Sequence, residues 1–243
     1  MGDGTVTKER VYEDYGDLPE VKLSDLEQDE ELLALEEGTM SARIALSFRD
    51  MRRATRILLD DNPTEPRLLF YVLMSDVIFF LNFGMKFAVA PGQNIENALP
   101  SELAGAIGGL VAICFLFRTA TLYLFSGVVA FFCRLVGGTG SWRDTRAGIF
   151  WASLVAAPIG VLSALVVVAM GYLAPTVPLF ADPMLVLPAQ LIGVIAFVYF
   201  VSASVAESHG FRNTSPIFVA FSLLTVAILV FGLYLLDSLR AMF

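Results

Sequence analysis

The chain has 243 residues, of which 56% are hydrophobic and only 16% are charged, and its mean hydropathy is +0.70. Soluble domains carry about 25% charged residues, so this composition excludes an ordinary soluble protein and indicates a chain surrounded by lipid. The formal net charge of −8 comes from the N-terminal part and does not describe the body of the chain.

The first 40 residues are acidic. They hold 13 acidic and 3 basic side chains, a net charge of −10, with only short apolar islands between them. We predict an acidic, mostly disordered cytoplasmic tail over 1–40, in which Ser24 and Glu27 would cap a transient helix over 25–36. The segment lacks the apolar core of a signal peptide, so the first span is expected to direct membrane insertion.

Residues 41–66 are predicted to form a basic amphipathic helix followed by a linker. Four apolar residues recur at helical spacing: Ile44, Phe48, Met51 and Leu58. Four arginines fall largely on other faces: Arg49, Arg52, Arg53 and Arg56. This pattern is typical of an interfacial helix, and we predict that these arginines contact an anionic membrane surface. The alternative is a solvated helix that packs on the bundle.

Residues 67–243 are predicted to form a bundle of about five transmembrane helices, which makes the chain an all-α integral membrane protein. A span needs about 20 predominantly apolar residues, and the approximate spans are 68–90, 113–133, 147–173, 184–205 and 217–236. The apolar stretch over 103–136 is too long for one perpendicular helix. It forms either one span or a re-entrant piece followed by a span.

Basic residues between the spans predict the orientation. Arginines follow the second and fourth spans, whereas the segments after the first and third contain no Lys or Arg; the arginines are Arg134, Arg143, Arg146 and Arg212. The positive-inside rule therefore places the N-terminus and these two loops in the cytoplasm and the C-terminus outside.

Ionisable residues inside the spans are candidate functional residues. Counted along straight helices, Asp76 lies about 12 Å from the inner edge and Lys86 lies close to the outer interface, where it can extend outward. Arg118 precedes Arg134 by about 24 Å of helix. This depth matches Asn82 rather than Asp76, so we expect Arg118 to contact Asn82 or to extend outward, and Asp76 to form hydrogen bonds between helices.

Small residues in the third and fourth spans, among them Gly160 and Gly193, predict that these two helices approach closely.

No catalytic residue, metal site or cofactor is predicted. His209 is the only histidine, and neither an HExxH nor a GxSxG motif occurs. The glycine-rich segment over 137–141 lacks the Lys-Ser/Thr ending of a phosphate-binding loop, so we predict a tight, flexible turn there.

The two cytoplasmic loops resemble those of the Yip domain family, in particular its bacterial branch. The first loop reads RLVGGTGSWRD over 134–144, and the second reads His209-Gly210-Phe211-Arg212. The family pattern has paired glycines, a further glycine, an aromatic residue and an acidic residue, which here would be Gly137, Gly138, Gly140, Trp142 and Asp144. The resemblance covers roughly 68–236.

The resemblance implies a cytosolic N-terminus, five spans and, from eukaryotic members, binding to Rab or Ypt GTPases. The Asp-Leu-Tyr-Gly-Pro segment of those members is missing, because Tyr15-Gly16-Asp17-Leu18-Pro19 has the same residue types in another order. A GTPase partner therefore does not carry over to this chain.

Three functions remain open at this point. A non-enzymatic membrane adaptor or organiser is favoured, because a polar tail and a basic helix accompany a bundle without polar groups aligned at one depth. The alternative is a small transporter or channel subunit that uses the polar intramembrane residues, and the third is an intramembrane enzyme. The expected partners are the lipid bilayer and a membrane protein of unknown identity, with no nucleic acid, and oligomerisation stays open. The expected location is the bacterial inner membrane.

Overall fold

The computed structural model describes residues 39–88 and 100–242. The predicted acidic tail lies almost wholly outside these residues, so that prediction stays untested. The chain divides into two units, Met1–Arg43 and Ile44–Phe243, and the following description concerns the second. Every element in the described part of the chain is a helix, which confirms the predicted all-α class.

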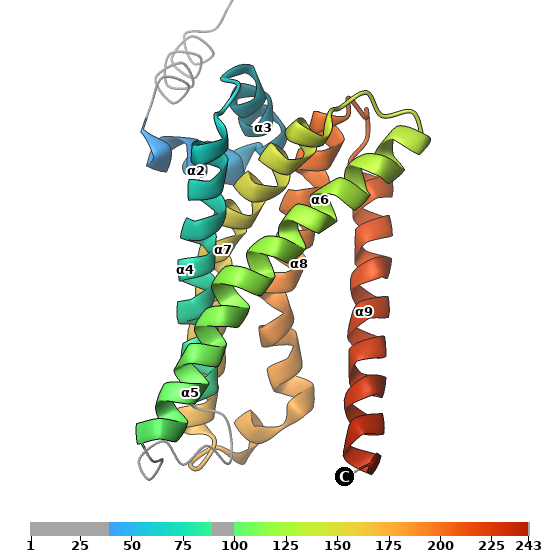
Figure 1. Ribbon diagram of the computed structural model, residues 1–243. Coiled ribbons are helices and arrows are strands. Elements are labelled where there is room, and N and C mark those ends of the chain that lie inside the picture. Colours follow the sequence, from blue (N-terminus) through green and yellow to red (C-terminus); the bar gives the residue numbers. More distant parts are fainter. Residues whose placement is uncertain (1–38, 89–99, 243) are drawn as a thin grey trace, which may run out of the picture. The chain divides into compact units, whose positions relative to one another are not determined.

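Five helical segments among the described residues are long and apolar enough to cross a membrane, as predicted (Figure 1). Their bounds are α4 (Glu65–Ala88), α5 with η2 and α6 (Pro100–Val111, Ala112–Phe117 and Arg118–Leu135), α7 (Trp142–Leu173), α8 (Pro183–Ser208) and α9 (Ser215–Met242). Local sequence sets where α7 and α8 begin. Ser141 and Asp144 form a capping box before α7, and Asp182 caps α8 ahead of a proline in its first turn.

The long second apolar stretch forms one continuous helix and not a re-entrant piece followed by a span. It contains 12 residues of α5, 6 of the π-helix η2 and 18 of α6, which together reach about 54 Å. This helix crosses the others obliquely in Figure 1, and a helix longer than the hydrocarbon thickness is commonly accommodated in a bilayer by tilting. A π-helical turn inside an α-helix often marks a functional position, and Arg118 follows this one directly.

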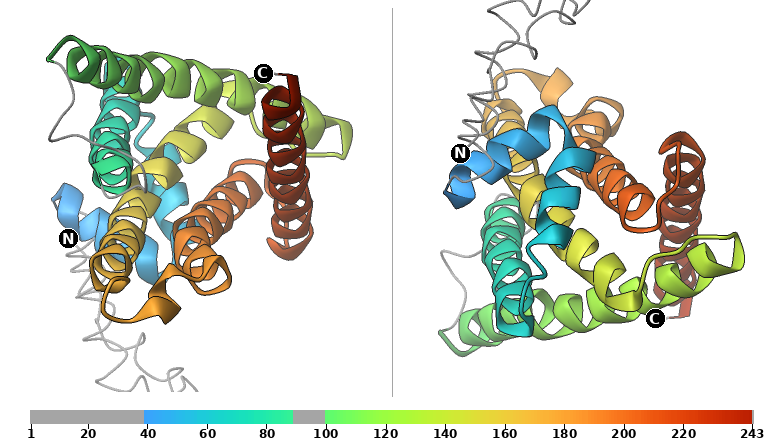
Figure 2. Two further views of the ribbon diagram at one scale, coloured as in Figure 1. Left: turned by 90° about the horizontal axis from the view of Figure 1, so that it is seen from below. Right: turned by 90° about the horizontal axis from the view of Figure 1, so that it is seen from above.

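Helix α7 is the centre of the bundle and contacts α4, α6 and α8. Its first half carries the largest buried side chains, including Phe150 and Trp151. A Cβ atom on Gly193 of α8 would lie 3.1 Å from the Cα atom of Gly160 in α7, so the predicted close approach of these helices is confirmed. Helix α9 packs on α8 at the edge of the bundle, as Figure 2 shows.

The predicted single amphipathic helix is instead two helices, α2 (Met40–Arg49) and α3 (Met51–Asp60). The break occurs at Asp50, which has extended backbone and accepts a hydrogen bond from the Arg53 amide at 3.0 Å. An aspartate in this position starts a new helix, because it satisfies an amide that has no partner within the helix. The predicted helical periodicity is therefore confirmed, and Asp50 divides the segment into two helices because its side chain caps the second one.

Helix α3 packs on the bundle, which is the alternative that the sequence left open. It contacts α7 and α8, and its buried side chains are Met51, Ala54, Thr55 and Leu58. A polar contact strengthens this packing, since the hydroxyls of Thr55 and Ser204 lie 2.9 Å apart. Helix α2 is also in contact with the bundle, because the Trp151 indole donates to the Ser47 hydroxyl at 3.0 Å. The apolar side of α3 therefore faces protein, whereas Phe48 of α2 is 46% exposed.

Candidate functional site

The two glycine-containing loops that resemble the Yip pattern lie against each other at one end of the bundle. We call them the loop cluster, comprising residues 136–145 and 207–212. The Thr139 amide donates to the His209 carbonyl at 3.2 Å, and the His209 ring nitrogen Nε2 lies 2.8 Å from the Thr145 hydroxyl. The structure therefore brings together two motifs that are about 70 residues apart in the chain.

Glycine is required in this cluster because backbone and ring atoms occupy the space of a side chain. A Cβ atom on Gly138 would lie 2.8 Å from both the Cys133 carbonyl and His209 Nδ1, and one on Gly140 would overlap the Ser208 carbonyl. Gly137 and Gly210 have φ angles of +93° and +70°, which residues with a Cβ rarely adopt. The turn is thus tight, as predicted, and it is closely packed against the end of α8.

The contacts of His209 define its protonation. The Thr145 hydroxyl donates its only proton to the Ser141 carbonyl at 2.9 Å, so Nε2 of His209 must donate to Thr145. Nδ1 is then an acceptor, and it is buried without a hydrogen-bond partner in the described part of the chain. Burial lowers the pKa of His209, the charge of Arg134 lowers it further, and Asp144 opposes both effects. His209 is therefore neutral at pH 7.

The remaining motif residues connect the cluster to the helices. Asp144 accepts from the Ser141 amide at 2.9 Å, and the Trp142 indole donates to the Ser126 hydroxyl at 3.2 Å. Phe211 stacks on the His209 ring. Among residues 39–88 and 100–242, no three His, Cys, Asp or Glu side chains are grouped in a way that could hold a metal ion.

Two of the arginines that were predicted to contact lipid, Arg52 and Arg56, are bound to the loop cluster. Glu207, at the end of α8, accepts from Arg52 Nε at 2.9 Å and from Arg56 Nε at 2.6 Å. Arg52 also donates to the carbonyls of Phe211 and Arg212, at 2.7 and 2.8 Å. The hydrogen bond and charge of Glu207 raise the pKa of Arg56.

Arg52 and Arg56 thus have a nearly buried carboxylate as counter-charge, while their side chains stay 31% and 65% exposed, and their predicted contact with lipid stays a prediction. Glu207 is 9% exposed, and it follows Arg52 by 155 residues, so periodicity within 41–59 could not reveal it. Arg49 is exposed, and its predicted contact with lipid stays a prediction. The same holds for Arg53. Arg212 contributes its carbonyl to the cluster, while its side chain is exposed.

Within the membrane-spanning helices, Arg118 pairs with Asp76. Nη1 of Arg118 contacts Oδ1 of Asp76 and donates to the Ser75 hydroxyl at 2.8 Å, and the guanidinium lies 4.8 Å from the centre of the Phe79 ring. The Thr119 hydroxyl donates to the other carboxylate oxygen. Asp76 is fully buried.

The predicted contact of Arg118 with Asn82 is therefore wrong. Counting 1.5 Å per residue along a perpendicular helix placed Arg118 too far from the inner edge, because the helix that carries it is oblique and contains a π-helical segment (Figure 1). Asp76 does connect two helices through hydrogen bonds, as predicted, but its main partner is a cation.

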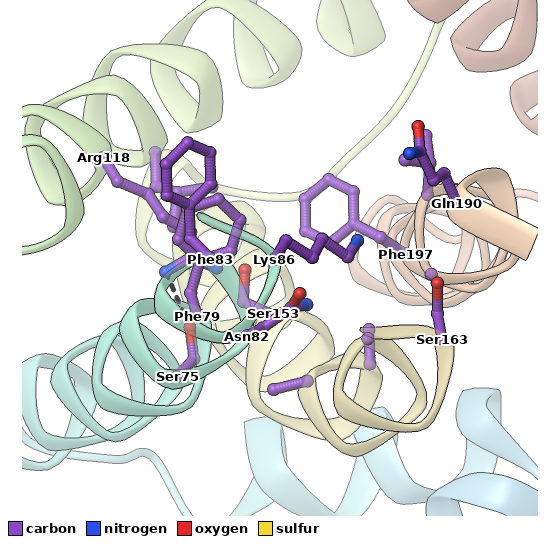
Figure 3. A pocket seen from close by; sticks show the side chains of 16 residues that line it. Ser75, Phe79, Asn82, Phe83, Lys86, Arg118, Ser153, Ser163, Gln190 and Phe197 are labelled. Carbon is purple, nitrogen blue, oxygen red and sulfur yellow. Dashed lines mark hydrogen bonds between the residues drawn. The ribbon is translucent and has the colours of Figure 1, made fainter. Parts of the chain in front are cut away.

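A cavity of about 370 Å³ lies beside this ion pair and is bounded by α4, α6, α7 and α8. Figure 3 shows its polar side chains, which are Ser75, Asn82, Lys86, Arg118, Ser153, Ser163 and Gln190. Sequence reasoning selected three of them. It missed the serines and Gln190, since single polar residues of these types are ordinary in spans, and their convergence depends on the packing of four helices.

Comparison with known proteins supplies a family. Neither a curated protein nor a solved structure matches the chain. The profile of the Yip1 domain matches residues 46–236, which include α3, the first four long helices, most of α9 and both loops of the cluster. The chain therefore belongs to the Yip1 domain family and is a membrane protein with several apolar helices.

Proposed function

We propose that this protein is a non-enzymatic membrane adaptor or organiser. The observation that supports the proposal most is the double ion pair of Arg52 and Arg56 with Glu207, which fixes α3 to the loop cluster. The segment before the first span is thereby held on the same end of the bundle as the two interlocked loops. Such an arrangement presents one ordered polar surface to a protein partner, and loops held by a rigid scaffold are common binding elements.

We further propose that this end faces the cytoplasm of a bacterial inner membrane. Helix α3 and the loop cluster lie at the end of the bundle opposite to the C-terminal end of α9 (Figure 1). The loops carry the arginines that the positive-inside rule assigns to the cytoplasm. Reporters inserted after residue 40 or within 137–141 should report cytoplasm. A reporter fused after Phe243 should report the opposite side, and a cytoplasmic signal there would contradict the proposed orientation.

The adaptor role is tested by affinity capture of the full chain from native membranes. Glu207→Gln removes the carboxylate that holds α3, whereas Asp60→Asn removes one negative charge from the exposed end of the same helix and serves as the matched control. We expect membrane proteins that co-purify with the wild type and with Asp60→Asn to be lost from Glu207→Gln. If the wild type and both variants captured the same membrane proteins equally, the surface formed by α3 and the loop cluster would have no role in partner binding.

A small transporter remains the second candidate, since a polar cavity lies next to an intramembrane ion pair. Polar groups inside spans often mark the paths of ions and substrates. Proton-coupled flux through reconstituted wild-type protein, lost in Asp76→Asn, would favour this function over the adaptor. Absence of flux with intact partner capture would favour the adaptor.

A further inference from the structure

The cavity between α4, α6, α7 and α8 contains polar groups that the protein leaves without partners. Asn82, Lys86 and Gln190 line it and make no hydrogen bond or ion pair with another described residue. The hydroxyl of Ser153, which is 1% exposed, is buried there and is also unpartnered. Unsatisfied polar groups are costly within a bilayer, and a buried hydroxyl beside the half-buried Asn82 and Lys86 indicates an occupant that binds them.

The charges of the cavity indicate the sign of this occupant. Two cations line the wall, but Asp76 neutralises Arg118. Lys86 has no acidic partner in the described part of the chain. One positive charge therefore remains, accompanied by amide and hydroxyl groups that can donate hydrogen bonds. Such a set fits a single anionic group whose oxygen atoms accept these hydrogen bonds.

The rest of the wall is apolar, which indicates what carries the anion. Aromatic and aliphatic side chains separate the polar groups: Phe79, Phe83, Leu122, Val194 and Phe197. Lys86 lies in the last turn of α4, about 32 Å along that helix from Glu65 and so near a membrane interface, while Ser75 lies about 15 Å along it. The cavity thus extends from an interface towards the middle of the membrane.

From this arrangement we propose that the cavity binds one anionic amphiphile, with its acidic group at Lys86 and Asn82 and its apolar chain between the aromatic side chains (Figure 3). A volume of about 370 Å³ lies near the lower end of the range of small-molecule pockets, so it accommodates the acidic group and one chain. The second chain of a phospholipid would remain outside. This site is separate from the adaptor surface, and its test does not depend on that proposal.

The test is native mass spectrometry of the purified full chain after exposure to an equimolar mixture of phosphatidylglycerol and phosphatidylcholine. The wild type should retain one phosphatidylglycerol molecule in preference to phosphatidylcholine. Lys86→Met keeps the aliphatic stem but removes the charge, so the preference should fall about tenfold or more. Arg212→Gln removes an exposed arginine charge outside the spans and should leave the preference unchanged. Equal retention of both lipids by the wild type would overturn the proposal.

Ser153→Ala separates binding from folding. Because the hydroxyl is buried without a partner, its removal should not lower the thermal midpoint of lipid-free protein, yet it should weaken retention of phosphatidylglycerol. Ala157→Phe, which places a ring in the cavity, should abolish retention. If Lys86→Met and Ala157→Phe both remained folded and retained the lipid as the wild type does, the cavity would not be its binding site.

Competition identifies the source of the anion. Lysophosphatidylglycerol, which has one chain and the single charge of a phosphodiester, should displace the bound lipid, whereas inorganic phosphate at the same concentration should not, because it lacks the chain that fills the apolar wall. Displacement by inorganic phosphate alone would show a site for a free anion and would overturn the amphiphile proposal. Failure of both to displace the lipid would overturn it as well.

Discussion

Replacing Gly140 by alanine tests whether close backbone contact holds the loop cluster together. A methyl group at this position would overlap the Ser208 carbonyl and lie 3.0 Å from His209 Nδ1. The overlapped atom belongs to the backbone at the end of α8 and cannot move aside as a flexible side chain would. The loops must therefore separate, and the hydrogen bond from Arg134 to the Gly140 carbonyl, now 3.0 Å, is strained with them.

Substitutions at two further glycines separate backbone strain from steric overlap as causes of the expected loss of stability. Gly137 has a positive φ but open space around it, so Gly137→Ala isolates backbone strain, which is about 1 to 2 kcal/mol. Gly140 does not have a positive φ, so Gly140→Ala isolates overpacking, about 1 to 3 kcal/mol. Gly105 lies within α5 with no atom near its Cβ position. Gly105→Ala is the control and should be neutral or stabilising, by up to about 1 kcal/mol.

The three variants are compared by chemical unfolding of purified protein in one detergent, with thermal aggregation as a second measurement. We expect Gly140→Ala and Gly137→Ala to be less stable than the wild type and Gly105→Ala not to be. Accelerated hydrogen exchange over 136–141 and 207–212 in Gly140→Ala should place the damage in the loop cluster. If Gly140→Ala matched the Gly105 control in stability and exchange, the proposed contact between the two loops would be refuted.

Three other predictions concern charges. Burial lowers the pKa of His209 in the folded state. Its contribution to the free energy of unfolding is therefore complete above about pH 6.5 and declines as the pH falls below that value. In chemical unfolding measured between pH 7 and 5, His209→Gln should lose less stability with falling pH than the wild type. Asp76→Asn leaves Arg118 without its counter-ion and should cost about 3 kcal/mol, whereas replacing both residues by leucine should cost less, as a double-mutant cycle would measure. Glu207→Gln should raise hydrogen exchange over 51–60 about fivefold, since it removes two partly exposed ion pairs worth about 1 kcal/mol together.

The spans could be predicted from the sequence because their signal is local. A run of about 20 apolar residues reveals a membrane helix without knowledge of its neighbours, and the loop motifs were found because their glycines and His209 form a recognisable family pattern. The packing of Gly138 and Gly140 against Ser208 and His209 gives that pattern a steric reason, which the sequence does not contain.

The contacts that sequence reasoning missed are those that depend on distant residues or on helix tilt. The pattern over 41–59 correctly separated an apolar from a basic face, but periodicity alone cannot distinguish burial against protein from burial in lipid. Only the structure shows that Glu207 binds Arg52 and Arg56. For Arg118, the error came from treating a helix of about 54 Å as perpendicular to a membrane with an apolar thickness of about 30 Å.

The Arg118–Asp76 pair also defines what the neighbouring cavity can bind. If Asp76 were absent, Lys86 and Arg118 would both present uncompensated charge, and a doubly charged group would be favoured. With Asp76 fully buried against Arg118, one cation remains for the occupant, and a doubly charged group would leave one negative charge unpaired at high desolvation cost. A phosphodiester, which carries one charge, should therefore be retained in preference to a phosphomonoester, whose charge approaches −2 at pH 7. Stronger retention of phosphatidic acid than of phosphatidylglycerol by the wild type would refute this assignment of charges.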